Sequence, residues 1–246
     1  MNPIKFLMQS LRSAAAAGWL ALPLAAQTLP AVHDSHAAAD VRRPAAGPLG
    51  SIHAHVCGFH FYSGDMPRAL RVHHYCSHLN PDVFQCVIYD SDRADARLIG
   101  IEYIISEKLF AGLPADEKQL WHSHRYEVMS GQLTAPGLAA GAEKELMQEL
   151  VGTYGKTWHL WQVDRGDTVP LGLPKLMMGF TADGQADASM VAERDGEQRI
   201  DAAQVKIRRT ELSPRPVATG ADAWQHGPAF QLSDHLLTQP RVTRQP

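Results

Sequence analysis

Hydrophobic and polar positions alternate over several stretches of the chain, and this alternation predicts β-strands. Branched and aromatic residues recur at every second position between clusters of turn-forming residues, as in half-buried strands. The predicted strands cover residues 52–62, 83–89, 97–106, 126–134, 157–163 and 176–180. The second and third of these flank a polar turn at 90–95, so we expect them to pair as a hairpin.

Apolar spacings of three and four residues predict helices between the strands. Pro67 suits a first helical turn, and Leu70, His74 and His78 follow it at near-helical spacing. The predicted helices cover residues 67–78, 107–113, 114–121 and 143–154. Hairpins interspersed with helices are typical of the α+β class, so the sequence predicts a mixed or antiparallel sheet with flanking helices and a polar C-terminal extension.

Differences in composition divide the 246-residue chain into four parts. Lys5 and Arg12 precede a small, apolar run to Ala26, which is the order of charge and hydrophobicity in a secretory signal peptide. A cleaved export segment predicts a periplasmic or secreted protein. The predicted parts are a signal peptide at 1–26, a flexible linker at 27–50, a globular domain at 51–180 and a C-terminal extension at 181–246, packing on or around the domain.

Net charge and cysteine content narrow the classes of function. The formal net charge is −3 and no stretch concentrates Lys and Arg, so the sequence predicts no nucleic-acid partner. Beyond the N-terminal run, no apolar stretch is long enough to span a bilayer. Cys57, Cys76 and Cys86 allow at most one intrachain disulfide, and a domain of this size does not need one to fold.

Histidines crowd the first half of the chain and form the candidate site. His122 and His124 are two residues apart and are followed by Glu127, so they offer two ring nitrogens and one carboxylate. These are the ligand types of a metal site with an open position, suited to zinc, copper or iron. His53 and His55 form a second such pair and are the further ligands that we expect. The alternative is that these imidazoles are buried hydrogen-bonding groups.

The position of Glu127 depends on the course of the backbone. In an extended strand, His122 and His124 point to one side and Glu127 to the other. A bend at residues 125–126 would bring Glu127 to the same side. Without that bend the carboxylate must come from elsewhere, for example from Glu102 on the neighbouring hairpin.

Several long blocks of the sequence match a known family. Between about residues 55 and 180 the chain resembles the oil body-associated protein-like family, also catalogued as domain of unknown function 1264. The matching blocks are HVCGFHFYSGDM, HHYCSHLN, QCVIYDSDRADARLIGIEYIIS, LWHSHRYEVMSG, YGKTWHLWQVDRGD and PLGLPKLMM. The resemblance implies lipid association, because plant members are associated with seed oil bodies, and it implies no catalytic residues.

Two classes of function stay open on this sequence. The first, which the resemblance favours, is an exported bacterial binding or structural protein that associates with lipid or envelope surfaces. The second is a metal-binding protein or a metal-dependent enzyme that uses the histidines. The cysteines also occur in cytosolic members of the family, which implies that the fold does not depend on a disulfide. The sequence predicts neither a substrate nor an oligomeric state.

Overall fold

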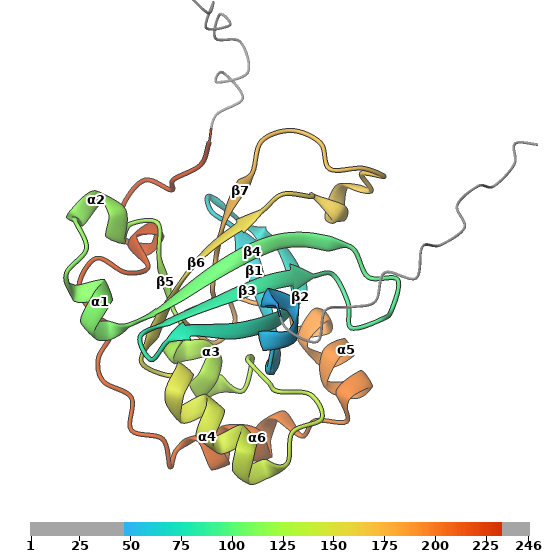
Figure 1. Cartoon of the computed structure of the whole chain (residues 1–246), viewed down its shortest axis with the longest axis vertical. Helices are drawn as coiled ribbons and strands as arrows, with labels where there is room; N and C mark the ends of the chain where they lie inside the picture. The colour runs from blue at the N-terminus through green and yellow to red at the C-terminus, as the bar shows by residue number, and fades with distance from the viewer. Residues whose placement is uncertain (1–46, 233–246) are drawn as a thin grey trace, which may run out of the picture. The chain divides into compact units, whose positions relative to one another are not determined.

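The computed structural model describes residues 47–232, and its strands form a closed antiparallel barrel (Figure 1). The order around the barrel is β4-β3-β2-β1-β7-β6, and β6 pairs back with β4. These strands are β1 (Ala54–Tyr62), β2 (Asp65–Asn80), β3 (Val83–Tyr89), β4 (Leu98–Ser106), β6 (Thr153–His159) and β7 (Lys175–Met178). A short strand, β5 (His122–Ser123), pairs with the beginning of β6.

Short helices connect the strands and follow the last of them. The α-helices are α1 (Glu107–Ala111), α2 (Ala115–Lys118), α3 (Arg125–Ser130), α4 (Ala140–Leu150), α5 (Ala188–Gln198) and α6 (Ala202–Arg209). The 3-10 helices are η1 (Pro48–Ser51), η2 (Val163–Arg165) and η3 (Ala223–Gln225). Polar side chains cap three of the α-helices at their N-termini, namely Ser106 for α1, Asp187 for α5 and Asp201 for α6. None of the helices in residues 47–232 has the length and hydrophobicity to cross a membrane. The expected signal peptide and nearly all of the expected linker lie outside the described residues.

The expected α+β fold, a mixed or antiparallel sheet with flanking helices, is wrong, because the sheet is a closed antiparallel barrel with a few helices. The strand β7 pairs with β1 on one side and with β6 on the other, and β6 pairs with β4, so the sheet closes on itself. Closure removes the free edges that an open sheet would have to protect. The alternation of hydrophobic and polar residues is the same in an open and a closed sheet, so it could not distinguish them.

The helix expected at 67–78 is also wrong, because this segment is the middle of β2. Val72, His74 and Cys76 are buried at every second position. The interval of four residues between His74 and His78 equals two strand periods and nearly one helical turn, so it did not discriminate. Pro67 lies at a register irregularity in the β1–β2 pairing, where a residue without an N–H is tolerated.

The strand expected at 126–134 is replaced in its first half by α3. The amide of Val128 donates to the carbonyl of His124, and the helix ends at Gly131, whose φ of 80° is left-handed. A helical turn buries Glu127 and Val128 together, which consecutive residues of a strand with one buried face cannot do. Only Thr134 is paired, in an isolated bridge to Cys57.

The barrel interior is layered along the strands. One apolar cluster contains the disulfide between Cys76 and Cys86, and Val128 of α3 and Leu150 of α4 pack into it. A second cluster contains Val72, Ile88 and Ile99 and lies further along the same strands. Between the two lies a layer of buried polar side chains: His60, His74, Glu102, Thr157 and His159.

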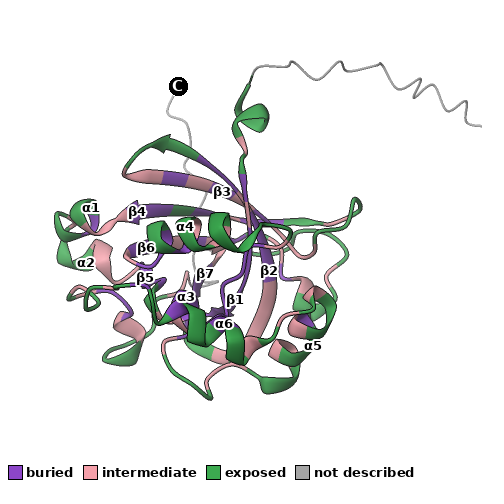
Figure 2. Ribbon diagram, turned by 90° about the horizontal axis from the view of Figure 1, so that it is seen from below, coloured by how far each residue is buried: buried purple, intermediate pink, exposed green. Residues whose placement is uncertain are grey.

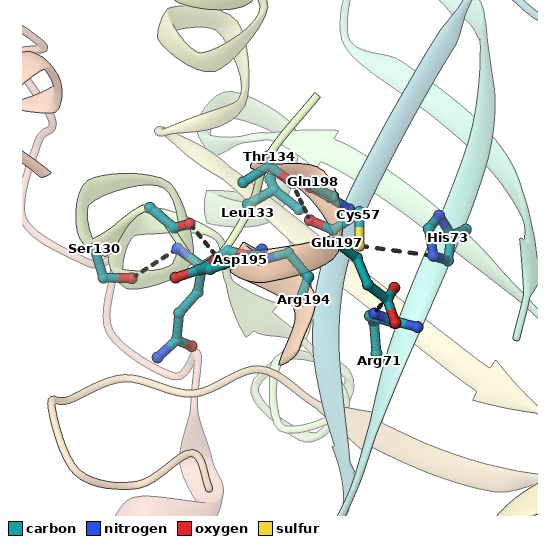
Figure 3. A network of polar contacts seen from close by, with 12 residues as sticks. Cys57, Arg71, His73, Ser130, Leu133, Thr134, Arg194, Asp195, Glu197 and Gln198 are labelled. Atoms are coloured by element: carbon teal, nitrogen blue, oxygen red, sulfur yellow. Dashed lines mark hydrogen bonds and ion pairs between the residues drawn. The ribbon is translucent and has the colours of Figure 1, made fainter. Parts of the chain in front are cut away.

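The outer face of β1 and β7 is covered by the segment that follows the barrel. Phe59 and Phe61 pack there with partly buried side chains of α5 and η3. Figure 2 shows the buried residues concentrated in the strands and the exposed residues on the outer sides of α4 and α6. Figure 3 shows how α5 is attached by polar contacts, among them Arg71 to Glu197 and Thr134 to Gln198. The part of the polar C-terminal extension that forms α5 therefore contributes to the packed structure.

Candidate metal centre

The polar layer inside the barrel is organised around Glu102. This residue lies in the middle of β4, opposite Cys86 of β3 and Thr157 of β6, and is 2% exposed. Four imidazole nitrogens lie within 3.9 Å of its carboxylate. The nitrogens are Nε2 of His74 at 2.7 Å, His124 at 3.2 Å, His122 at 3.4 Å and His60 at 3.9 Å. We call these four histidines and Glu102 the barrel centre.

The four histidines reach the centre from three parts of the barrel wall. His60 comes from β1 and His74 from β2, while His122 and His124 come from the β5 strand and the residue that follows it. Gly155 of β6 leaves the space in which the Glu102 carboxylate lies, because a Cβ at this position would overlap Glu102 Oε1. The same Cβ would be 2.9 Å from His122 Nε2, so a glycine is required here on both counts.

An aspartate from the C-terminal segment fixes the backbone between His122 and His124. Asp222 accepts from the backbone N–H of Ser123 at 2.8 Å and from its hydroxyl at 2.6 Å. Its own amide donates to the Trp121 carbonyl at 3.1 Å. Through these three bonds, the carboxylate of Asp222 is attached to Ser123 of β5 and its backbone amide to Trp121, the residue before β5. The orientation of the two histidines therefore depends on residues that lie about a hundred positions later in the chain.

Hydrogen bonds determine which nitrogen of His124 carries its proton. The Thr153 hydroxyl has one proton and donates it to the Leu150 carbonyl at 2.7 Å. It must then accept the bond of 2.8 Å from His124 Nδ1, so Nδ1 carries the proton. In a neutral ring this leaves Nε2 with a lone pair, and Nε2 is the atom that lies 3.2 Å from Glu102 Oε1.

Several other nitrogens in the layer have no hydrogen-bond partner among the described residues. Both ring nitrogens of His74 and of His122 are in this state, as is Nδ1 of His159. His74 Nε2 lies 2.7 Å from Glu102 Oε2 but outside hydrogen-bonding geometry. Buried polar groups without partners are rare in native proteins, and each calls for an explanation such as strain, a catalytic role or ion binding.

The electrostatics favour an ionised Glu102 and several neutral histidines, whereas for His122 the effect of burial, which lowers the pKa, is outweighed by the nearby Glu102 carboxylate, which raises it. Burial would raise the pKa of Glu102, but the electrostatic effect of the surrounding histidines, that of His74 first, outweighs burial and holds the pKa well below its usual range. Burial lowers the pKa of His60 and His124, and it lowers that of His159 to about 3. The carboxylate is thus ionised and these imidazoles are neutral at ordinary pH.

Glu127 lies beside the centre in a different protonation state from Glu102. It is 2% exposed, and burial raises its pKa to about 8, with the charge of Glu102 acting in the same direction. It lines a small cavity together with His60, His74 and His124. The cavity volume of about 10 Å³ is enough for one water molecule or one ion. Glu127 is therefore an uncharged carboxylic acid facing a space of atomic size.

The structure brings together three of the five residues expected at the site. His122, His124 and Glu127 surround the same interior, because the chain leaves β5 and enters α3 at Arg125, which supplies the bend that Glu127 requires. His53 and His55 lie elsewhere. His53 Nε2 is 3.0 Å from His78 Nδ1 at the surface. His55 Nε2 is 3.0 Å from Nδ1 of His73 on β2.

Residue parity explains which histidines reach the interior. His60 and Val56 are at even positions of β1 and face inward, whereas His55 is at an odd position and faces outward. On β2 the inward residue is His74 and the outward residue is His73. His60 and His74 were visible in the histidine-rich stretch, but the registers from β1 through β2 and β3 to β4 are needed to show that they share a face with Glu102.

The comparisons with known proteins agree with the resemblance of the sequence blocks. The family model described as "Protein of unknown function (DUF1264)" matches residues 46–213. Oil body-associated protein 1B of Arabidopsis thaliana is 45% identical over 178 residues, which are 70% of this chain and 74% of that protein. Oil body-associated protein 1A of Zea mays is 54% identical over 138 residues, 56% of this chain and 58% of that protein.

Oil body-associated protein 2A of Zea mays is 44% identical over 190 residues, which are 75% of each protein. No solved structure matches the chain. The region that the family model matches contains every strand of the barrel and all residues of the barrel centre. The chain therefore belongs to the DUF1264 family of proteins of unknown function, with oil body-associated proteins of plants among its relatives.

Proposed function

We propose that the chain is a metal-binding protein that holds a divalent transition metal in the barrel centre. The contact between His124 Nε2 and Glu102 Oε1, 3.2 Å apart, supports this most directly. The bond to Thr153 keeps the His124 proton on Nδ1, so the Nε2 lone pair faces the lone pairs of a carboxylate. A cation between the two atoms replaces this repulsion with two coordinate bonds.

A purely structural role would make the centre costly. A buried polar atom without a partner costs about 1–3 kcal/mol, and His74 and His122 each contribute two such atoms. Apolar side chains of similar volume would fill the same space without that cost. Bound metal gives a partner to Nε2 of these histidines and to the Glu102 carboxylate. The expense of the buried polar layer is then offset by the free energy of metal binding.

The donor set favours intermediate metals over hard or soft ones. Imidazole nitrogens suit zinc, copper and iron, while magnesium and calcium prefer sites made of oxygen ligands. The two cysteines nearest the centre, Cys76 and Cys86, are joined in a disulfide and offer no thiolate. The centre should therefore prefer Zn²⁺, Fe²⁺ or Cu²⁺ to Mg²⁺, Ca²⁺ or Cu⁺.

The test is metal analysis of protein purified without a histidine tag, followed by titration of the chelated protein with Zn²⁺. We expect the wild type to retain metal, and we expect Glu102→Gln to weaken Zn²⁺ binding by at least about 100-fold. Glu149→Gln is the matched control, because Glu149 is exposed and bonds His78 outside the barrel. Wild-type protein that is metal-free and takes up no zinc, copper or iron would show that the proposal is wrong.

A second proposal, association with a lipid surface, is supported by the names of the relatives, which are oil body-associated proteins. The connection between β6 and β7 also exposes apolar side chains, namely Leu160, Val169 and Leu171. Flotation with a phospholipid-coated triacylglycerol emulsion tests the association. We expect the protein in the floating layer, and less of it after all three residues are changed to serine. Equal recovery of both proteins in the aqueous layer would contradict the proposal.

We also propose that the present chain is exported and acts as a binding or structural protein. The support is the charged start and apolar run before Ala26, which lie outside the described residues. N-terminal sequencing of the protein from its native host tests the proposal. We expect a mature chain that begins near residue 27, in a periplasmic or culture-medium fraction. An intact Met1 in the cytoplasmic fraction would contradict it.

A further inference from the structure

The ligand atoms around Glu102 separate into two sets. One set consists of His60, His74 and Glu102, and the other consists of Glu102, His122 and His124. Within each set the ligand atoms lie within 4.8 Å of one another. The sets have Glu102 in common and share no histidine. The two carboxylate oxygens divide in the same way, since Oε2 faces His74 and His60 while Oε1 faces the other two histidines.

One ion cannot take all five side chains as they stand. Ligand atoms bound to one ion at about 2.1 Å are at most about 4.2 Å apart, and tetrahedral neighbours are about 3.3 Å apart. The contacts of Glu102 Oε1 with His122 and His124, at 3.4 and 3.2 Å, match the tetrahedral spacing. The ligand atoms of the five side chains do not all lie within 4.8 Å of one another, so at least one pair is too far apart to share an ion.

We propose that the barrel centre binds two divalent transition-metal ions bridged by the Glu102 carboxylate. One ion is held by Glu102 Oε2 with His60 and His74, and the other by Glu102 Oε1 with His122 and His124. This inference rests on the proposed metal-binding function and adds a second ion to it. Carboxylate-bridged ions in two-metal sites are about 3.5–4 Å apart, which a single carboxylate with separate histidine pairs can span.

Each set also has a neighbour that orients one of its imidazoles. His159 Nε2 lies 3.4 Å from His60 Nδ1, and Thr153 Oγ1 lies 2.8 Å from His124 Nδ1. Both contacts occupy Nδ1 and direct Nε2 to the carboxylate. Bonds of this kind to the non-ligating nitrogen are usual for metal-bound histidines. Their presence in both sets is what two separate ions require.

Three protein ligands leave each ion with open positions. The adjoining cavity of about 10 Å³ limits what can occupy them to a molecule of about the size of water. A ligand of the size of water fits this space, and a larger organic ligand does not. The exchangeable ligand of the centre is accordingly a small inorganic molecule.

The stoichiometry of Co²⁺ binding to the chelated full chain tests the inference. We expect native mass spectrometry to show two Co²⁺ ions per chain. The double variants His60→Gln/His74→Gln and His122→Gln/His124→Gln should each retain one ion. The matched control, His53→Gln/His78→Gln, removes a surface pair whose rings are stacked 5.0 Å apart outside the barrel and should retain two.

Electron paramagnetic resonance of the wild type gives a second measurement that needs no variant. Two Co²⁺ ions bridged by one carboxylate interact magnetically, so the signal at two equivalents should be altered in shape and less than twice that at one. Two independent signals that simply add would overturn the bridged pair, whether or not the double variants fold.

The outcomes separate the two proposals. One ion per chain, lost in both interior double variants, overturns the two-ion centre and leaves the metal-binding function standing. Two ions of which one is lost in the surface control also overturn it, because the second ion then lies outside the barrel. Absence of any bound Co²⁺, Zn²⁺, Fe²⁺ or Cu²⁺ overturns both proposals.

Discussion

Gly155 shows how one residue without a side chain makes the centre possible. It lies on β6 opposite Ile104 of β4, and Glu102 and His122 converge on the space that a Cβ would take. Its conformation is not unusual, so the requirement is for space alone. An alanine leaves the strand intact but forces Glu102 to move, and with it the oxygen that faces His122 and His124.

We expect Gly155→Ala to reduce Zn²⁺ affinity by about 10–100-fold while the chain stays folded, because the ligands are displaced and none is removed. Calorimetric titration of the chelated protein measures the affinity, and circular dichroism the fold. Gly152→Ala is the matched control, since a Cβ there meets nothing within 4 Å. Equal affinities of the two variants would mean that the geometry around Glu102 is unimportant for binding.

At the scale of elements, strands with local signals could be predicted and elements set by distant contacts could not. The strand at 83–89 is confirmed as β3, because its alternation is complete within seven residues. The segment of β2 was mistaken for a helix because only its pairing with β1 and β3 distinguishes the two periods. The same limit applies to the site: the local pair His122 and His124 was found, whereas His60 and His74 depend on register.

Helix α5 carries a buried cation, Arg194, that contacts the barrel in addition to the other polar and apolar contacts of the helix. Arg194 is fully buried and donates to the carbonyls of Gln132 at 2.6 Å and Gly131 at 3.1 Å. Its guanidinium also lies 4.9 Å from the centre of the Phe59 ring and pairs with Asp195 at 2.7 Å. The planar guanidinium donates to the two carbonyls that follow α3 and at the same time lies over the Phe59 ring on the outer face of β1. A lysine ammonium group could not make both kinds of contact.

We expect Arg194→Met to lower the free energy of unfolding by about 3–5 kcal/mol, because two carbonyls and one carboxylate lose a charged partner. Arg93→Met serves as the control; Arg93 pairs with Asp95 at an exposed turn, so the change should be under about 0.5 kcal/mol. Urea unfolding followed by tryptophan fluorescence compares the two. Similar losses would show that α5 is attached mainly by its apolar contacts.

At the scale of the whole molecule, the barrel carries a polar layer between two apolar ones. The disulfide between Cys76 and Cys86 lies at the border of that layer, next to Glu102 in the sheet register, while Cys57 is a buried free thiol. The disulfide joins two strands that are already neighbours, and its two cysteines are only ten positions apart in the sequence. It therefore adds a short covalent loop to a structure that is closed by hydrogen bonds.

We expect the double variant Cys76→Ala/Cys86→Ala to stay folded and to lose about 2–3 kcal/mol, the contribution of a loop of this length. For a domain of this size that corresponds to a fall in Tm of roughly 4–12 °C. Thermal denaturation with and without reductant, for wild type and variant, measures it. A variant that is unfolded at room temperature would mean that the disulfide is essential to the barrel.

Closure by β7 has a consequence for when the protein becomes complete during its synthesis. Phe61 near the start of the barrel pairs with Met178 at its end, so a growing chain keeps an open sheet until β7 has emerged. Pairing over such a long interval is slow, and the uncovered edges of β1 and β6 can meanwhile associate with other chains. The barrel interior therefore closes only when β7 pairs with β1 and β6. On the proposed export and metal binding, a chain exported unfolded takes its metal from the compartment that receives β7.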